Sequence, residues 1–381
     1  MRCRALRAAG SRGPRDDLIS GRRGAARPLG LSKDHRPGAQ HHEQADDEDG
    51  DDDPEQDFEH QSLPVVQTGI CKRGARSGAA EAAVTRAALL TLHGMGRTPP
   101  DYAAGLIAAV RSRLGPDAAA VSFEAVWYQR ELQRNQEELW RRASREHRLG
   151  WPALRRFVLF NLSDAVGLEA GKDEAQSSYY FAQLRVAQAL LQARDEMGGD
   201  GPVVVLAASL GGQVFSSYVY DAQRALAAER GQRTPPSAGI WVSRATLEQA
   251  LGGGSLGDGQ VGYLRGATLD ALLTTGCNIP VFVASHRRMS VRAIERPNPH
   301  FEWHNYFDPA DVLGWPLQPL EGGYRELARD HVVQVGNALI GWTPLAHDAY
   351  WRDRAVLDAV VAQLQRALAP RDASSAAPDD G

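Results

Sequence analysis

A serine stands at the point where the most apolar short run of the chain ends. Pro202–Ala207 reads PVVVLA, and Ala208-Ser209-Leu210-Gly211-Gly212 follows it. A buried strand that passes through one serine into a helix holds that serine in a strained turn, so the positions two before and two after it must be small. Ala207 and Gly211 meet this requirement, although glycine is more usual at the first position. The Ser209 hydroxyl would then stand at a helix N-terminus as a candidate nucleophile.

A second glycine-containing turn follows the first apolar run of the chain. Ala87–Leu92 reads AALLTL, and His93-Gly94-Met95-Gly96 comes directly after it. Attack by a serine develops an oxyanion, which backbone N–H groups stabilise, and the expected donors are Met95 and Leu210. Each motif also has a plainer explanation. A serine before a helix is often only an N-cap, and the turn could be an ordinary strand end where His93 packs locally.

Together these motifs resemble those of the α/β-hydrolases, of the serine esterase or lipase-like kind. The resemblance covers about Ala87–Ala369 and rests on the His93–Gly96 turn, the Ala207–Gly211 turn, and acidic and histidine segments later in the chain. It implies catalytic residues in the order Ser, Asp or Glu, His, and an acyl-enzyme mechanism that needs no cofactor. The motifs are short and are shared by enzymes with many different substrates.

The acid and base that the resemblance implies have candidates in the expected order. Phe301–Phe307 is a predicted strand, and Asp311 in the loop after it is the first choice for the acid, since two apolar residues follow it as in the family's acid loop. Asp308 is the close alternative because it ends the strand directly. Either aspartate could instead open a turn. His347 follows the last predicted strand, Val332–Val335, and precedes the final helix, which makes it the expected base.

Metal chemistry is not expected from this sequence. His300, Glu302 and His304 are spaced differently from the His-Glu-x-x-His motif of zinc proteases, and they fall on a predicted strand instead of a helix. The three cysteines (Cys3, Cys71 and Cys277) are too scattered for a disulfide framework or a zinc site.

The elements that must position these residues alternate between strands and helices. We predict a single α/β domain over 86–369, with a mostly parallel sheet covered by helices on both faces. A polar, tryptophan-containing insertion at 129–177 is expected to form a helical cap, and the glycine-rich stretch 231–266 a mobile loop. The further predicted strands are Ala118–Tyr128 and Leu269–Thr274, and the predicted helices are Tyr102–Leu114, Ser178–Met197 and Tyr350–Leu368.

Both ends of the chain have a different composition. Residues 1–85 lack apolar periodicity, and a basic stretch at 1–27 is followed by an acidic one at 43–59. Like charges at this density repel one another, so we expect a disordered tail. No apolar segment follows the first arginines as a signal peptide would require. Residues 370–381 are expected to be a second disordered end.

The charge and hydropathy of the sequence argue against two classes of function, nucleic-acid binding and membrane spanning. The net charge of −4 provides no basic surface for nucleic acid, and no apolar run is long enough to cross a bilayer. We therefore expect a cytoplasmic serine hydrolase that cleaves a small-molecule or lipid-like ester through Ser209, Asp311 and His347. Two alternatives remain, because fold alone does not fix function. One is a catalytically inactive binding or scaffold protein, and the other is an amidase or thioesterase.

Overall fold

The computed structural model describes residues 84–96, 98–170, 177–285, 292–335, 347 and 349–370. The predicted tails fall almost entirely outside these ranges. The chain divides into two units after Arg76, and all described residues belong to the second, Ser77–Gly381.

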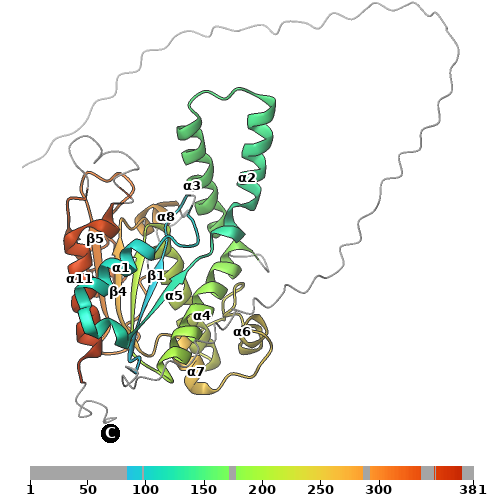
Figure 1. The fold of residues 1–381 in the computed structure, drawn as a ribbon. Coiled ribbons are helices and arrows are strands. Elements are labelled where there is room, and N and C mark those ends of the chain that lie inside the picture. Colours follow the sequence, from blue (N-terminus) through green and yellow to red (C-terminus); the bar gives the residue numbers. More distant parts are fainter. Residues whose placement is uncertain are drawn as a thin grey trace, which may run out of the picture. The chain divides into compact units, whose positions relative to one another are not determined.

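The centre of this unit is a six-stranded sheet in which every neighbouring pair is parallel (Figure 1). The strand order is β2-β1-β3-β4-β5-β6, so the predicted α/β class with a parallel sheet is confirmed. The strands are β1 Ala87–Leu92, β2 Val121–Val126, β3 Val203–Ala208, β4 Leu269–Thr275, β5 Glu302–Phe307 and β6 Ala328–Val332.

Apolar residues on successive strand positions fill two separate cores, because neighbouring side chains of a strand point to opposite faces. In β1, Leu90 and Leu92 face one core, whereas Leu89 faces the other. The first core lies against α4 (Ser178–Met197) and α5 (Leu210–Glu229). The second lies against α1 (Ala104–Leu114) and α11 (Arg354–Leu368). Helices therefore cover both faces, as predicted.

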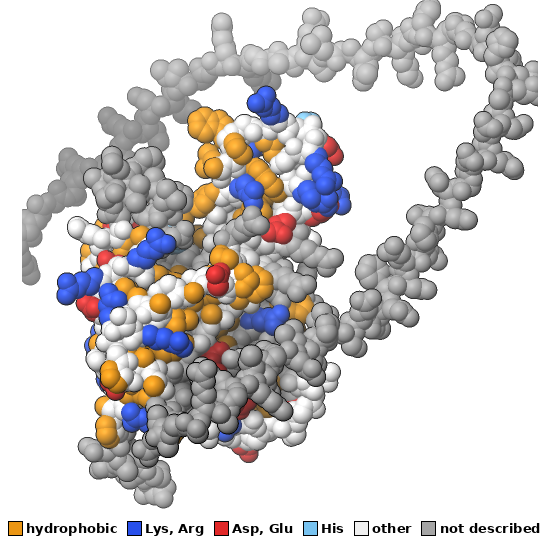
Figure 2. Space-filling model, in the orientation of Figure 1, with side chains coloured by type: hydrophobic (Ala, Val, Ile, Leu, Met, Phe, Trp, Pro, Cys, Tyr) orange, Lys and Arg blue, Asp and Glu red, His pale blue; other side chains and the backbone are white. Residues whose placement is uncertain are grey.

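The predicted insertion contains two helices that pack against each other. They are α2 (Gln129–Glu146) and α3 (Pro152–Ala170), and Figure 1 shows them side by side beyond the sheet. Four apolar side chains at four-residue spacing on α3 are 44–64% exposed: Leu154, Val158, Leu162 and Val166. Figure 2 shows apolar and basic side chains together on this pair of helices.

The stretch 231–266, expected to be a mobile loop, contains two short helices. They are α6 (Arg244–Ala250) and α7 (Asp258–Leu264). Ser243 caps α6 by accepting a hydrogen bond from the Thr246 N–H, and the Gln260 side chain accepts one from the Gly257 N–H before α7. The many glycines give the stretch the composition of a loop, and this composition conceals the two capped helices.

Three further boundaries differ from the sequence-based prediction. The last strand, β6, ends at Val332, whereas the prediction began there, because the charged residues of ARDHV concealed the strand. Residues Gly115–Ala120 form a 3-10 helix before β2, and α11 begins at Arg354 after a 3-10 turn at Tyr350–Arg352. The remaining helices in the described ranges are α8 (Ile279–Ser285) and α9 (Tyr324–Leu327). No helix among the described residues is long and apolar enough to cross a membrane.

Candidate active site

The predicted site residues gather at the carboxyl ends of the strands. β1 lies between β2 and β3, and the helices that follow β1 and β3 cover opposite faces of the sheet. In open α/β sheets, ligands bind in the crevice at such a switch point. The turn His93–Gly96 follows β1, and Ser209 follows β3. Sheet topology therefore brings the two glycine-containing motifs to the same end of the sheet, where β1 and β3 have their carboxyl ends.

Ser209 has the strained backbone that a strand–serine–helix turn requires. Its φ and ψ are 51° and −118°, and Trp151 is the only other non-glycine residue in the described ranges with positive φ. Holding a residue in such a region costs about 1–3 kcal/mol, so the surrounding structure must enforce it. The Ser209 N–H donates to the Thr275 carbonyl at 2.8 Å. At Gly211, a Cβ would lie 2.7 Å from the His93 carbonyl oxygen, so only glycine fits.

The glycine-containing turn after β1 lies directly against the serine. A Cβ on Gly94 would lie 2.9 Å from Ser209 Cβ and 3.5 Å from Ser209 Oγ. Met95 follows Gly94, and Leu210 is the first residue of α5. Neither backbone N–H hydrogen-bonds to another described residue. Met95 and Leu210 are thus the chain neighbours of Gly94 and Ser209, the two residues that are in contact.

His93, at the start of this turn, is held by aromatic packing and by hydrogen bonds to the backbone. Its ring stacks on Tyr128 at 4.0 Å and meets Tyr102 edge-on at 5.1 Å. Nδ1 donates to the Gly94 carbonyl at 2.8 Å, and Nε2 accepts from the Tyr128 N–H at 3.3 Å. Burial lowers the pKa of His93 to about 4, against the opposing effect of the Gly94 hydrogen bond. The ring is therefore neutral near pH 7.

Asp311 and His347 form a buried pair, although 36 positions separate them in the chain. His347 Nδ1 donates to Asp311 Oδ2 at 2.8 Å, and the Asp311 side chain is 1% exposed. The carboxylate also accepts from the Tyr350 hydroxyl at 2.9 Å and the Leu313 N–H at 3.0 Å. Burial alone would raise the pKa of Asp311, but these hydrogen bonds and the nearby His347 hold it below its ordinary value. The carboxylate is thus ionised and orients the imidazole.

Asp308, the alternative acid, bonds to backbone instead. Its carboxylate accepts from the Ala310 N–H and the Val335 N–H, both at 2.9 Å. Its own N–H donates to the Tyr350 hydroxyl at 2.9 Å. The structure therefore brings Asp311, and not Asp308, to the imidazole, while Asp308 shapes the loop after β5.

The imidazole of His347 rests on Gly276, the residue after β4. A Cβ there would lie 2.8 Å from His347 Cε1 and 3.0 Å from Nδ1. The preceding residue, Thr275, accepts the Ser209 N–H, so the imidazole lies one strand away from the serine. No hydrogen bond joins Ser209 to His347. Ser209 Oγ and His347 Nε2 are both buried and have no partner among the described residues.

Several residues around the site were missed by sequence reasoning. Tyr350 is only the first residue of the predicted final helix, and Gly276 lies beyond the predicted strand Leu269–Thr274, so neither suggested a contact with the site. Asp164 on α3 accepts from the Gly96 N–H at 3.1 Å. A sequence signal for it existed, because it is a lone acid within the largely apolar stretch 157–168.

Of the two histidines in the zinc-like spacing, only His304 lies in a cluster of polar side chains. His304 Nε2 lies 2.9 Å from Glu302 Oε2, and His304 Nδ1 lies 2.9 Å from His331 Nε2. His300 lies outside β5 and is exposed. Within the described ranges, no three His, Cys, Asp or Glu side chains are grouped so that they could hold a metal ion.

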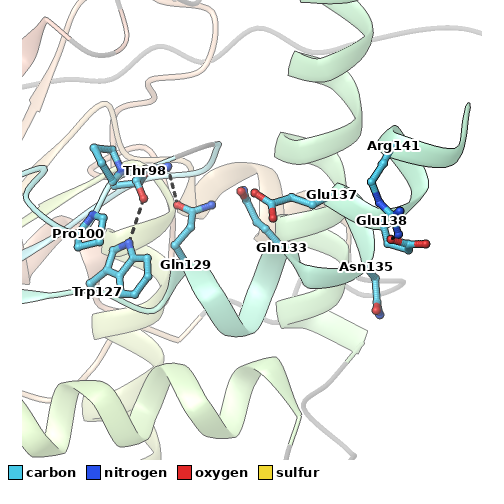
Figure 3. Close-up of a pocket in the computed structure, with 10 residues that line it drawn as sticks. Thr98, Pro100, Trp127, Gln129, Gln133, Asn135, Glu137, Glu138 and Arg141 are labelled. Carbon is cyan, nitrogen blue, oxygen red and sulfur yellow. Dashed lines mark hydrogen bonds and ion pairs between the residues drawn. The ribbon is translucent and has the colours of Figure 1, made fainter. Parts of the chain in front are cut away.

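A cavity of about 1260 Å³ lies beside the segment that follows the Gly96 turn (Figure 3). Trp127 and Gln129 line it and bond to Thr98. The Thr98 N–H donates to Gln129 Oε1, and Trp127 Nε1 donates to the Thr98 carbonyl, both at 2.9 Å. Its other lining residues are Pro99, Pro100, Gln133, Asn135, Glu137, Glu138 and Arg141. The cavity is thus lined both by α2 and by the backbone that leads away from the turn.

No protein-family model matches the sequence, and no curated protein matches it. Among solved structures, a hydrolase assigned to the alpha/beta superfamily from Xanthomonas campestris pv. campestris is 15% identical, with a TM-score of 0.33 over 74% of this chain and 99% of that chain. RedJ, solved with a polyethylene glycol molecule in its active site, is 13% identical, with a TM-score of 0.28 over 76% and 96%. Identities this low say nothing about an activity. With TM-scores below 0.5 these matches carry no argument about the family, and the α/β class of this chain rests on its own parallel sheet.

Proposed function

We propose that this protein is a serine hydrolase that cleaves an ester-like acyl bond through an acyl-enzyme intermediate. The observation that carries the proposal is the Asp311–His347 hydrogen bond. Its imidazole contacts Gly276, the residue after β4, and β4 pairs with the strand that leads to Ser209. An ionised carboxylate on Nδ1 leaves Nε2 free to accept a proton. Among the described residues, that nitrogen and the Ser209 hydroxyl are both without partners.

The reaction follows from these positions. His347 Nε2 takes the Ser209 proton as the serine oxygen attacks the substrate carbonyl carbon. The N–H groups of Met95 and Leu210 stabilise the resulting oxyanion, a contribution of about 3–4 kcal/mol per donor in enzymes of this type. His347 then protonates the leaving oxygen, and water attacks the acyl-enzyme in the same way. Asp311 stays ionised throughout and holds the imidazole in the reactive tautomer.

Covalent labelling tests this proposal. A fluorophosphonate probe should label the wild type and should not label Ser209→Ala, because the probe reacts with a serine that has an adjacent base and an oxyanion site. Ser217→Ala is the matched control, since Ser217 lies on α5 but two turns from its start, and it should label like the wild type. Equal labelling of Ser209→Ala and the wild type, or none of either, would refute the proposal and favour a binding or scaffold role.

The substrate class must be measured separately, because esters, thioesters and amides all react through a similar tetrahedral intermediate. We expect hydrolysis of p-nitrophenyl esters of increasing chain length, and abolished turnover in Ser209→Ala and His347→Ala. A thioester and an anilide of matched acyl group complete the comparison. Preference for either of these over the ester by kcat/KM would replace the esterase assignment with a thioesterase or amidase.

A further inference from the structure

Asp164 is a buried carboxylate that the proposed mechanism does not use. It lies on α3 with 1% of its surface exposed. Its three donors are neutral: the Gly96 N–H at 3.1 Å, Gln133 Nε2 at 2.8 Å and Gln136 Nε2 at 2.9 Å. No arginine, lysine or histidine of the described chain forms an ion pair with it. Burial raises the pKa of Asp164 to about 6, which the hydrogen bonds only partly offset.

This carboxylate holds one end of the turn that passes over Ser209. Gly96 has a φ of 90°, and a Cβ there would lie 3.3 Å from Oδ1 of Asn161, one turn before Asp164 on α3. The other end of the turn is fixed by the contact of Gly94 with Ser209. Met95 lies between these two fixed glycines. The direction of its N–H therefore depends on both contacts.

A buried carboxylate with no cation beside it among the described residues disfavours the packing of its helix. An apolar side chain at this position would pack α3 without the desolvation penalty that a buried carboxylate incurs. What the carboxylate offers is a directed acceptor for a backbone N–H and for two amide side chains of α2. These hydrogen bonds fix the geometry of the turn more than they stabilise the packing of α2 against α3.

We propose that Asp164 is a positioning residue that holds the Gly96 end of the turn, so that the Met95 N–H points at the developing oxyanion. This inference rests on the proposed hydrolase function, since it assigns Met95 as an oxyanion donor. Asp164 acts through the backbone and touches no reacting atom. Its removal should affect the transition state and leave substrate binding unchanged.

Two variants and one control separate positioning from general stability. Asp164→Ala removes the acceptor, and we expect kcat to fall on the order of 100-fold at unchanged KM, as when one oxyanion donor is lost. Asp164→Asn keeps one acceptor oxygen, and its amide can donate to the unpartnered Gln133 Oε1 or Gln136 Oε1. It should stay within about 10-fold of the wild type. Leu168→Ala, on the same helix and buried, weakens packing without touching the turn.

The affinity for a trifluoromethyl ketone reports on the oxyanion site directly, because its adduct with serine is tetrahedral. In Asp164→Ala, the inhibition constant should rise in parallel with the fall in kcat/KM. In Leu168→Ala, kcat and the inhibition constant should stay within about threefold of the wild type at a temperature where all variants are folded. Equal losses in Asp164→Ala and Leu168→Ala would overturn the inference, because they would indicate a structural role.

Amide hydrogen exchange gives a readout that needs no activity. Exchange in a peptide covering residues 93–98 should be faster in Asp164→Ala than in the wild type or Leu168→Ala. Faster exchange with unchanged kcat would overturn the inference, since the turn would then be loosened without consequence. A wild type that neither hydrolyses esters nor takes the fluorophosphonate would instead refute the proposed function, whatever the exchange shows.

Discussion

At the scale of single residues, the imidazole of His347 depends on a glycine that leaves it room. Gly276 has a φ of 53°, and a Cβ there would lie 2.8 Å from His347 Cε1 and 2.9 Å from the Tyr350 ring. Real Cβ atoms do not approach this closely, so an alanine must displace the histidine, the tyrosine or both. Both neighbours bind Asp311. The Asp311–His347 pair is therefore sensitive to one methyl group on a residue outside the pair.

Gly276→Ala should lower kcat/KM on the order of 100-fold, because a displacement of about 1 Å at a reacting group can cost that much. Gly266→Ala is the matched control. Its φ is also positive, at 88°, but the nearest atom to a Cβ there is Leu269 Cβ at 3.5 Å, an ordinary contact. Both variants should lose about 1–2 kcal/mol of unfolding free energy to backbone strain. If ester hydrolysis falls equally in both, the seating of His347 on Gly276 is unimportant.

At the scale of elements, β2 and α4 meet through two carboxylates and one hydroxyl. Ser122 Oγ lies 3.0 Å from Glu124 Oε1 and 2.8 Å from Glu196 Oε2. One hydroxyl proton cannot satisfy both carboxylates. Burial and repulsion from Glu196 raise the pKa of Glu124 to about 7, which outweighs the hydrogen bond from Ser122. Glu124 is therefore held most favourably when it is protonated.

Glu124→Gln should stabilise the protein at high pH. The pKa of Glu124 is about 4.5 in the unfolded chain and about 7 in the folded one, so its contribution is complete below pH 4.5 and is lost as the pH rises through 7. Glutamine stays neutral, so the variant should gain about 1–3 kcal/mol at pH 8 and less than about 1 kcal/mol at pH 5. Urea unfolding at both pH values measures this difference. An equal effect at both would exclude a titrating Glu124 as the cause.

Elements with a clear apolar pattern were predicted from the sequence to within a few residues. β1 and α4 have the predicted bounds, and Ser177 caps α4 by accepting the Tyr180 N–H. The two helices within 231–266 and the strand β6 were not predicted. Short capped helices and a charged edge strand lack an apolar period. Chain order and the resemblance together suggested Asp311 and His347, but neither indicates which side chains touch. The contacts of Asp164 and Gly276 depend on how elements far apart in sequence pack, which a single sequence does not reveal.

At the scale of the whole molecule, buried ionisable groups oppose one another across the pH range. Asp164 and Glu124 have raised pKa values of about 6 and 7, so each loses stabilisation as the pH rises. His93 has a pKa lowered to about 4 by burial, so it loses stabilisation as the pH falls from 6.5 toward 4. Glu302, whose pKa is lowered to about 2 mainly by its hydrogen bond from Arg366, loses stabilisation below about pH 4.5.

These opposing contributions predict a stability maximum on the acid side of neutrality. Between about pH 4 and 6 the gain from His93 and the loss from Asp164 nearly cancel, which leaves Glu124 to set the slope. The unfolding free energy should therefore peak near pH 5 and decline toward pH 8. Urea unfolding at unit steps from pH 4 to 8 would show this, and Glu124→Gln should move the peak above about pH 6. A wild-type maximum at pH 7 or higher would contradict a raised pKa of Glu124 as the main source of the pH dependence.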